Sequence, residues 1–328
     1  MEYVNLGASS LKVSRLCIGA LCMGDPAWRP YVLPEDGSRA VFKRALDHGF
    51  NLIDTSNYYS MGRSEEIVGR LVKEFVRRDD IIIATKFGNP MRRTPTGGGY
   101  SRKNILAAVD ASLKRLQTDY IDLYQTHIWQ HDTDLDEMVD ALDLLVRAGK
   151  ILYSGITVMP VWSFVSCVVK AKCTGRAPFV SVSNHYNLLW REDERELLPF
   201  CRHEGIGVLA HSAFARGMLC GRQRRAGSAK TIRSDTDEYA AFCYGQPEDY
   251  AYADFVEDFA RERGVSATQL ALAWVLSKPP VHSAILGATR PEQLDEAVAA
   301  LSIKLSPEEI QRLEKPYRYR QAECIAPG

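Results

Sequence analysis

The sequence lacks any stretch that would form a membrane-spanning helix. No run reaches about 18 consecutive uncharged apolar residues, which is the length that such a helix needs. The opening segment, MEYVNLGASS, contains no cationic stretch that leads into a long apolar run, so it does not resemble a secretory signal. We therefore expect a cytoplasmic protein without a membrane partner.

The sequence also lacks a net charge. Its 41 Lys and Arg residues balance 41 Asp and Glu residues, so no overall field attracts nucleic acid or anionic lipid. Hydrophobic residues make up 46% and charged residues 25% of the 328 positions, as is typical of a globular chain with a sizeable core. We expect a small molecule as the partner, and the composition leaves the oligomeric state open.

Cysteine motifs are missing as well. The 8 cysteines contain no CxxC pair, and several lie in apolar runs, which favours buried free thiols over metal ligands or disulfides. We therefore expect no metal site. The cysteines are Cys17, Cys22, Cys167, Cys173, Cys201, Cys220, Cys243 and Cys324.

Strand-like and helix-like segments alternate along most of the chain. Apolar runs rich in Ile, Val and Leu predict eight strands, at residues 14–20, 51–55, 81–86, 120–126, 151–157, 178–184, 207–212 and 283–289. Helical spacing follows them at residues 35–48, 64–76, 101–116, 135–148, 161–172, 191–204, 252–263 with 268–277, and 291–300. Eight such units predict an α/β fold, a (β/α)8 TIM barrel formed by residues 1–328 as a single domain.

Three further segments complete this prediction. Residues 3–6 and 11–13 flank a turn-rich GASS and predict an N-terminal β-hairpin at the floor of the barrel. Residues 213–250 show little periodicity, which predicts a long functional loop after strand seven. A last helix is expected at 306–314.

Four polar residues follow the predicted strands at the same end. Asp54 and Tyr59 come after the second strand, and Lys86 and His127 end or follow the next two. Each one alone has an ordinary explanation, as a helix cap, a solvated lysine or a hydrogen-bonded histidine. In a closed barrel, however, all four meet at the C-terminal mouth.

Together these groups have the chemistry for carbonyl reduction. A phenol with a pKa near 10 is a poor proton donor or acceptor at neutral pH, and an adjacent ammonium such as Lys86 lowers that pKa. Asp54 can hold the lysine charged and oriented. His127 can hydrogen-bond the reacting oxygen and set its position.

Six segments resemble the aldo-keto reductases over residues 3–315: DTSNYYSMGRSEEIVGR, ATKFG, DYIDLYQTH, GKILYSGIT, NHYNLLWREDER and GVLAHS. They are most similar to the branch that includes secondary-metabolite reductases and potassium-channel β subunits. The resemblance implies a (β/α)8 barrel, NADPH/NADP+ as cofactor, and a tetrad of Asp54, Tyr59, Lys86 and His127. It implies hydride transfer to a carbonyl carbon, with Tyr59 donating the proton and no metal taking part.

The resemblance also implies a cofactor site. To hold the carboxamide, the family usually has Ser-Asn or Ser-Ser after strand five, where this chain has Thr157 and Val158, and Gln on strand six, where it has Ser183. At the end of strand seven, His211 stands in place of an aromatic residue that stacks on the nicotinamide. Residues 213–225, with Arg222, Arg224 and Arg225, resemble a loop that covers the pyrophosphate. Arg290 is the candidate for the 2′-phosphate, since a guanidinium matches phosphate with a fork of donors. The remaining cofactor candidates are Asn184, Ser212, Gly217, Gly287, Thr289 and Gln293.

Loop aromatics are the expected substrate walls, for a carbonyl compound of apolar or aromatic character. The candidates are Trp28, Tyr58 and Trp129. Two alternatives stay open: an NADPH-binding regulatory or interaction subunit, and a specialised reductase of an imine, enone or keto-sugar. The physiological substrate and stereochemistry also stay open.

Overall fold

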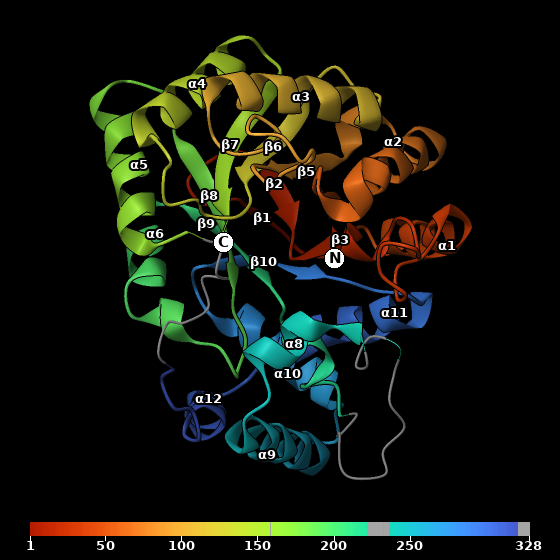
Figure 1. Cartoon of the computed structure of the whole chain (residues 1–328). Coiled ribbons are helices and arrows are strands. Elements are labelled where there is room, and N and C mark those ends of the chain that lie inside the picture. The colour runs from red at the N-terminus through yellow and green to blue at the C-terminus, as the bar shows by residue number, and fades with distance from the viewer. Residues whose placement is uncertain (158, 222–231, 233–235, 321–328) are drawn as a thin grey trace.

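The computed structural model describes residues 1–157, 159–221, 232 and 236–320 (Figure 1). A closed barrel of parallel strands forms its centre, in the order β10-β3-β4-β5-β6-β7-β8-β9, as the sequence predicts. The strands are β3 (Leu16–Gly19), β4 (Leu52–Asp54), β5 (Ile82–Phe87), β6 (Ile121–Thr126), β7 (Ile151–Thr157), β8 (Phe179–His185), β9 (Gly207–His211) and β10 (Val281–Leu286).

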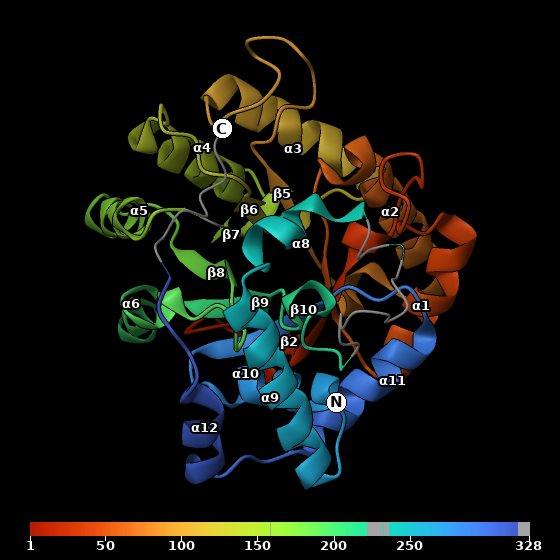
Figure 2. The same ribbon diagram turned by 60° about the horizontal axis from the view of Figure 1, so that its bottom comes forward.

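Helices surround the barrel, as Figure 2 shows. They are α1 (Glu35–Asp47), α2 (Arg63–Phe75), α3 (Arg102–Leu116), α4 (Leu135–Arg147), α5 (Val161–Cys173), α6 (Leu197–Glu204), α8 (Glu238–Cys243), α9 (Pro247–Arg263), α10 (Ala267–Ser277), α11 (Pro291–Ala299) and α12 (Pro307–Glu314). No helix in this described part of the chain is long and apolar enough to span a bilayer.

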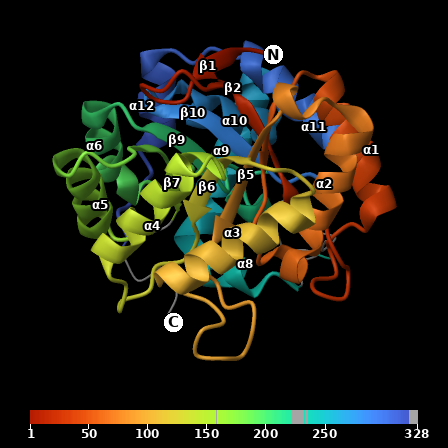
Figure 3. The ribbon, with the colours of Figure 1, turned by 90° about the horizontal axis from the view of Figure 1, so that it is seen from above.

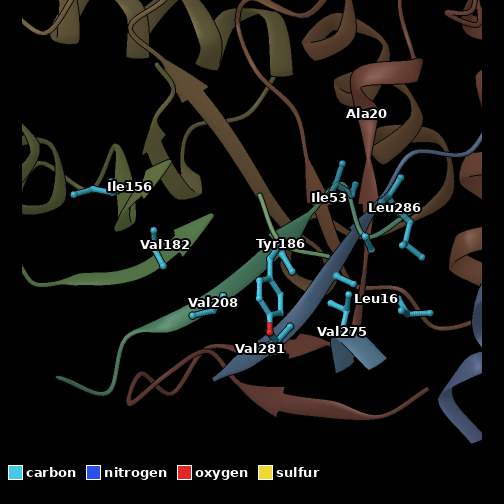
Figure 4. Close-up of a cluster of buried hydrophobic side chains, with 14 of the residues drawn as sticks. Leu16, Ala20, Ile53, Ile156, Val182, Tyr186, Val208, Val275, Val281 and Leu286 are labelled. Atoms are coloured by element: carbon cyan, nitrogen blue, oxygen red, sulfur yellow. The ribbon is translucent and has the colours of Figure 1, made fainter. Parts of the chain in front are cut away.

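Side chains alternate between two buried clusters along each strand. Leu16 and Val208 belong to the outer cluster, between strands and helices, and Figure 4 shows them on either side of β10. Their neighbours Cys17 and Leu209 point into the barrel and form the inner cluster. This inner packing fills the barrel beside the N-terminal segment, and the C-terminal mouth lies at the opposite end.

The predicted hairpin closes the other end. β1 (Tyr3–Asn5) pairs antiparallel with β2 (Lys12–Ser14), and the buried Leu6 and Val13 complete the inner cluster. A Cβ at Gly207 would lie 2.5 Å from Leu6 Cδ1, so a larger residue there would displace the hairpin. Figure 3 shows the hairpin and α8 at opposite ends of the barrel.

The predicted helix over 191–204 is wrong in its first half. The segment begins with a 3-10 turn, η4 (Glu192–Glu194), and α6 starts only at Leu197. Pro199 explains the delay, because proline has no N–H and fits only in the first turn of a helix. A helix from residue 191 would place this proline in its interior.

The loop predicted over 213–250 is likewise only partly irregular. It contains a short 3-10 turn, η5 (Ala215–Gly217), as well as α8, and α9 begins at Pro247 rather than at residue 252. The Asp237 side chain caps α8 by accepting from the N–H of Ala240, and proline occupies the first position of α9, where it is favoured.

The cysteines show no disulfide in the described residues. Cys17, Cys167 and Cys201 are buried free thiols, as expected, whereas Cys173 is exposed on α5. Cys324 lies outside the described residues.

Candidate active site

The barrel brings the four predicted catalytic residues together at its mouth. Asp54 ends β4, Lys86 lies one residue before the end of β5, and His127 directly follows β6. Tyr59 begins η2 (Tyr59–Gly62), a short turn after β4. Because all these strands are parallel, their carboxyl ends form one rim.

Lys86 is the hub of this cluster. Its ammonium forms an ion pair with Asp54, donates to the carbonyl oxygen of Thr55 at 3.0 Å and lies 3.5 Å from the Tyr59 hydroxyl. Both members of the ion pair are buried. Burial lowers the pKa of Lys86, but Asp54 and Tyr59 together raise it further, so the group has a pKa above its ordinary value and stays charged.

The Tyr59 phenol differs from the sequence-based expectation. Burial raises its pKa, and the nearby Lys86, which lowers it, does not offset that effect. The phenol is therefore protonated at neutral pH, with a cation beside it that would stabilise the phenolate once the proton leaves.

His127 completes the cluster as a neutral imidazole. Its ring lies edge-on to that of Tyr59, with 5.5 Å between centroids. Burial, followed by the charges of Lys86 and His211, holds the pKa of His127 well below its usual value. Its backbone N–H donates to the Tyr100 hydroxyl at 3.1 Å, which in turn donates to the carbonyl of Ile128 at 2.5 Å.

The sequence analysis missed two polar contacts of the tetrad. Gln125 Nε2 donates to the second oxygen of Asp54 at 3.2 Å, and Ser56 Oγ lies 3.0 Å from His127 Nδ1. Strand alternation was the available signal for Gln125, since it lies two residues before His127 and therefore shares its face of the strand. Ser56 had no such signal, because its partner is 71 residues away.

Two of the predicted carboxamide ligands lie side by side. Thr157 pairs with Ser183 across β7 and β8. Both hydroxyls are buried and have no hydrogen-bond partner within the described residues. A hydroxyl both donates and accepts, so the pair suits a ligand amide, which needs one of each. Val158 lies outside the described residues.

Asn184 is not placed with these groups. Strand alternation puts it on the opposite face of β8 from Ser183, and its side-chain amide donates to Asp193 at 2.7 Å. Burial raises the pKa of Asp193 to about 6, although the hydrogen bond from Asn184 lowers it. This pair connects β8 to η4 rather than to the mouth.

His211 lies at the end of β9 in a column of rings. The His185 ring is 5.5 Å from His211 and stacks on Trp190 at 5.0 Å. His185 also hydrogen-bonds the Tyr244 hydroxyl, which follows α8. Burial, with Lys86 and Arg216, lowers the pKa of His211 to about 3, so it presents an uncharged ring at the mouth.

Left-handed backbone is concentrated in two mouth loops. Ser60 and Met61 follow Tyr59 with φ of 50° and 52°, and Ser212, Ala215 and Arg216 follow β9 with φ of 60°, 45° and 56°. Strained residues of this kind are found at functional sites, and left-handed turns aim backbone N–H groups at anions.

The second loop also offers space and a positive charge. A Cβ at Gly217 would meet nothing within 4 Å, which leaves room for a ligand against the backbone. Arg216 is mostly buried, forms an ion pair with Asp237 and lies over the Tyr239 ring. The predicted phosphate contacts Arg222, Arg224 and Arg225 lie outside the described residues.

The predicted adenosine-phosphate segment forms the N-terminus of α11. The Gln293 side-chain oxygen accepts from the N–H groups of Thr289 at 2.8 Å and Arg290 at 3.1 Å, which fixes the turn after Gly287. Arg290 is exposed and makes no ion pair within the described part of the chain. A helix N-terminus beside a guanidinium is a favourable place for an anion.

The expected substrate walls form two aromatic pairs. Trp28 lies edge-on to Tyr58 at 6.1 Å, and Trp129 lies edge-on to Trp162 at 5.7 Å. Trp162 was not predicted, and it is 63% exposed at the start of α5. The buried Trp129 indole N–H has no partner among the described residues.

A parallel (β/α)8 barrel whose mouth holds a lysine–carboxylate pair, a phenol and an imidazole defines a TIM-barrel enzyme. The model of the Aldo/keto reductase family matches residues 15–318, and the chain belongs to this family. It is therefore an oxidoreductase, in a family that generally uses NAD(P)H.

Relatives of similar length agree with this assignment. The chain is 38% identical to versiconal hemiacetal acetate reductase of Aspergillus parasiticus, over 100% of this chain and 99% of the relative. It is 35% identical to a putative aryl-alcohol dehydrogenase of Schizosaccharomyces pombe, over 96% of this chain and 95% of that relative. An aldo-keto reductase of Metarhizium robertsii is 32% identical, over 97% and 91%.

Proposed function

We propose that this protein reduces an aromatic or apolar aldehyde or ketone to the alcohol, with NADPH as hydride donor and Tyr59 as proton donor. The observation that carries the proposal is the contact of the Tyr59 hydroxyl with Lys86, 3.5 Å apart, at a mouth where Lys86 is paired with Asp54. A protonated phenol next to a permanent cation is suited to release a proton onto an oxygen that gains negative charge.

In the proposed reduction, the hydride and the proton come from different groups. NADPH, when bound, supplies the hydride that reaches the carbonyl carbon. Tyr59 gives its phenolic proton to the carbonyl oxygen, and the Lys86 ammonium stabilises the phenolate that remains. Asp54 keeps Lys86 charged, and His127 hydrogen-bonds the same oxygen to set its position. Solvent then returns a proton to Tyr59.

Several residues of this chain suit the cofactor. The unpartnered hydroxyls of Thr157 and Ser183 suit the carboxamide, and the neutral ring of His211 offers a surface for stacking. The loop at Ser212–Gly217 offers backbone N–H groups for the pyrophosphate. Arg290, exposed and at the start of α11, is the proposed partner of the 2′-phosphate.

The relatives and the mouth both favour an aromatic substrate. One relative is named for versiconal hemiacetal acetate and another for aryl alcohols. Two edge-on pairs are formed by the rings of Trp28 and Tyr58, both in loops, and by those of Trp129, in a loop, and Trp162, at the start of α5. Flat side chains of this kind bind aromatic surfaces through stacking and edge contacts.

Replacing Tyr59 by phenylalanine tests the proposal. The Tyr59→Phe variant loses the proton donor and no cofactor contact, so kcat with a panel of aromatic aldehydes should fall by about 10²–10⁴-fold. NADPH affinity, measured by fluorescence titration, should stay nearly the same. Tyr3→Phe, at an exposed hairpin tyrosine, is the matched control and should retain activity. Unchanged turnover in Tyr59→Phe would refute the role.

A further inference from the structure

Ser56 lies between β4 and Tyr59 and is fully buried. Its hydroxyl oxygen accepts from the backbone N–H of Tyr58 at 3.1 Å and lies 3.0 Å from His127 Nδ1. No other partner of this hydroxyl is found within the described residues. The Ser56 O–H can donate one hydrogen bond, and His127 Nδ1 is the only acceptor for it among the described residues.

The direction of this hydrogen bond follows from counting protons. If Nδ1 of His127 carried the hydrogen, Ser56 would accept twice, and the O–H of this fully buried side chain would point at no acceptor among the described residues. An unmade hydrogen bond at a buried donor is unfavourable. If Nδ1 is bare, Ser56 accepts from Tyr58, donates to Nδ1 and is fully satisfied.

We propose that Ser56 is a positioning residue that holds His127 as the neutral tautomer with its proton on Nε2. This inference rests on the proposed function for its purpose: a proton on Nε2 makes the ring a donor toward the carbonyl oxygen. With the proton on Nδ1, the lone pair of Nε2 would face the lone pairs of that oxygen. The neutral state of the ring, which burial and Lys86 enforce, leaves the tautomer as the only choice.

The backbone of His127 is held independently of Ser56. Its N–H donates to the Tyr100 hydroxyl, whose own proton goes to the carbonyl of Ile128. Removing the Ser56 hydroxyl therefore changes the proton position on the ring, while the strand end that places the ring stays fixed. This separation allows the tautomer to be tested apart from the fold.

The direct test is the tautomer itself, measured by two-bond ¹H–¹⁵N NMR of the histidine-labelled full chain without substrate. The His127 signal is assigned by its loss in His127→Gln. In the wild type, Nε2 should be protonated and Nδ1 bare. In Ser56→Ala the His127 signal should show a mixture of the two neutral tautomers. Ser56→Thr, which keeps a hydroxyl, should show the wild-type tautomer. A protonated Nδ1 in the wild type would overturn the inference, even if Ser56→Ala failed to fold.

Kinetics supply the second measurement. Loss of one hydrogen bond that selects the tautomer should lower kcat for an aromatic aldehyde by about five- to ten-fold in Ser56→Ala, with NADPH affinity unchanged. Ser112→Ala, a fully buried serine on α3, is the matched control. An unchanged tautomer in Ser56→Ala would contradict the inference. The expected tautomer together with no carbonyl reduction by the wild type would reject the proposed function alone.

Discussion

The charges at the mouth are set by single residues acting on their neighbours. Lys86 is kept cationic by Asp54, and it lowers the pKa of Tyr59, of His127 and of His211. Burial acts on the same groups and is the larger effect on each. The result is a protonated phenol and two neutral imidazoles around one buried ammonium, an arrangement that suits the proposed carbonyl reduction.

The tetrad could be predicted from the sequence because strand ends carry positional information. Asp54, Lys86 and His127 each end or directly follow a parallel strand, so the barrel rule alone places them on one rim. Ser56 could not be predicted, because it owes its place to a partner 71 residues away. Gln125 was missed although it shares the strand face of His127. The raised pKa of Tyr59 was also inaccessible, since burial is a property of the folded chain.

The ring of His211 is expected to act through its surface rather than through a proton. His211→Tyr should preserve or strengthen NADPH binding with normal turnover, because a larger ring buries more area, and His211→Ala should weaken binding. Fluorescence titration of NADPH and a pH–rate profile measure both effects. Tight binding with lost turnover in His211→Tyr would show that the imidazole takes part in the chemistry.

The His211→Tyr substitution should also make the protein lose less stability in acid. The pKa of His211 is about 3 in the folded chain and near 6.5 when unfolded, so only the unfolded chain takes up this proton between those values. The contribution of neutral His211 to stability is therefore present above about pH 6.5 and is lost as the pH falls toward 3. His211→Tyr should show a shallower loss of stability in that window.

Arg290 is expected to distinguish NADPH from NADH. Arg290→Ala removes the proposed partner of the 2′-phosphate, and a charge-assisted contact of this kind is worth about 1.5–3 kcal/mol, so NADPH affinity should fall about ten-fold or more. NADH affinity should stay the same. Arg290→Lys keeps the charge without the fork and should lie between the two. Equal losses for both cofactors would assign Arg290 a structural role.

At the scale of elements, the periodic segments were predicted well and the irregular ones less so. The eight strands and the helices between them follow from apolar spacing, whereas α8 and the first turns of α9 were assigned to a loop. The signals for both were present: Asp237 at the cap and Pro247 at the first helical position. With 6 residues, α8 is too short for apolar periodicity to detect it, and the first turn of α9 is polar.

The insertion after β9 is connected to the barrel mouth through specific contacts. Tyr244, at the end of α8, hydrogen-bonds His185 and accepts from Asn187 at 2.8 Å, and Asp237 pairs with Arg216 beside the mouth. Arg320, near the end of the described chain, pairs with Asp249 and donates to the carbonyl of Cys243 at 2.7 Å. The last described segment thus holds the insertion whose contacts support the ring column behind His211.

For the whole molecule, closure of the barrel depends on the contact between its first and last strands. Arg15, just before β3, donates to the carbonyl oxygens of Val281 at 2.6 Å, His282 at 3.0 Å and Leu276 at 2.6 Å. These partners are more than 260 positions away along the chain, so one guanidinium connects the two ends of the fold. The strand that it fixes, β10, leads directly into the proposed adenosine-phosphate segment.

Removing this guanidinium should destabilise the whole barrel. Arg15→Ala leaves three carbonyl groups without their charged donor, and such contacts are partly redundant, so the free energy of unfolding should fall by about 2–4 kcal/mol. Arg15→Lys keeps the charge but lacks the planar guanidinium that reaches all three acceptors. Its free energy of unfolding should lie between those of the wild type and Arg15→Ala. Urea denaturation followed by circular dichroism measures the loss.

Arg77→Ala is the matched control. The Arg77 side chain is 81% exposed and its ion pairs span 3.9 and 4.0 Å, so the substitution should change the free energy of unfolding by no more than about 0.5 kcal/mol. Equal losses in Arg15→Ala and Arg77→Ala would show that closure is secured by the strand pairing of β3 and β10 alone.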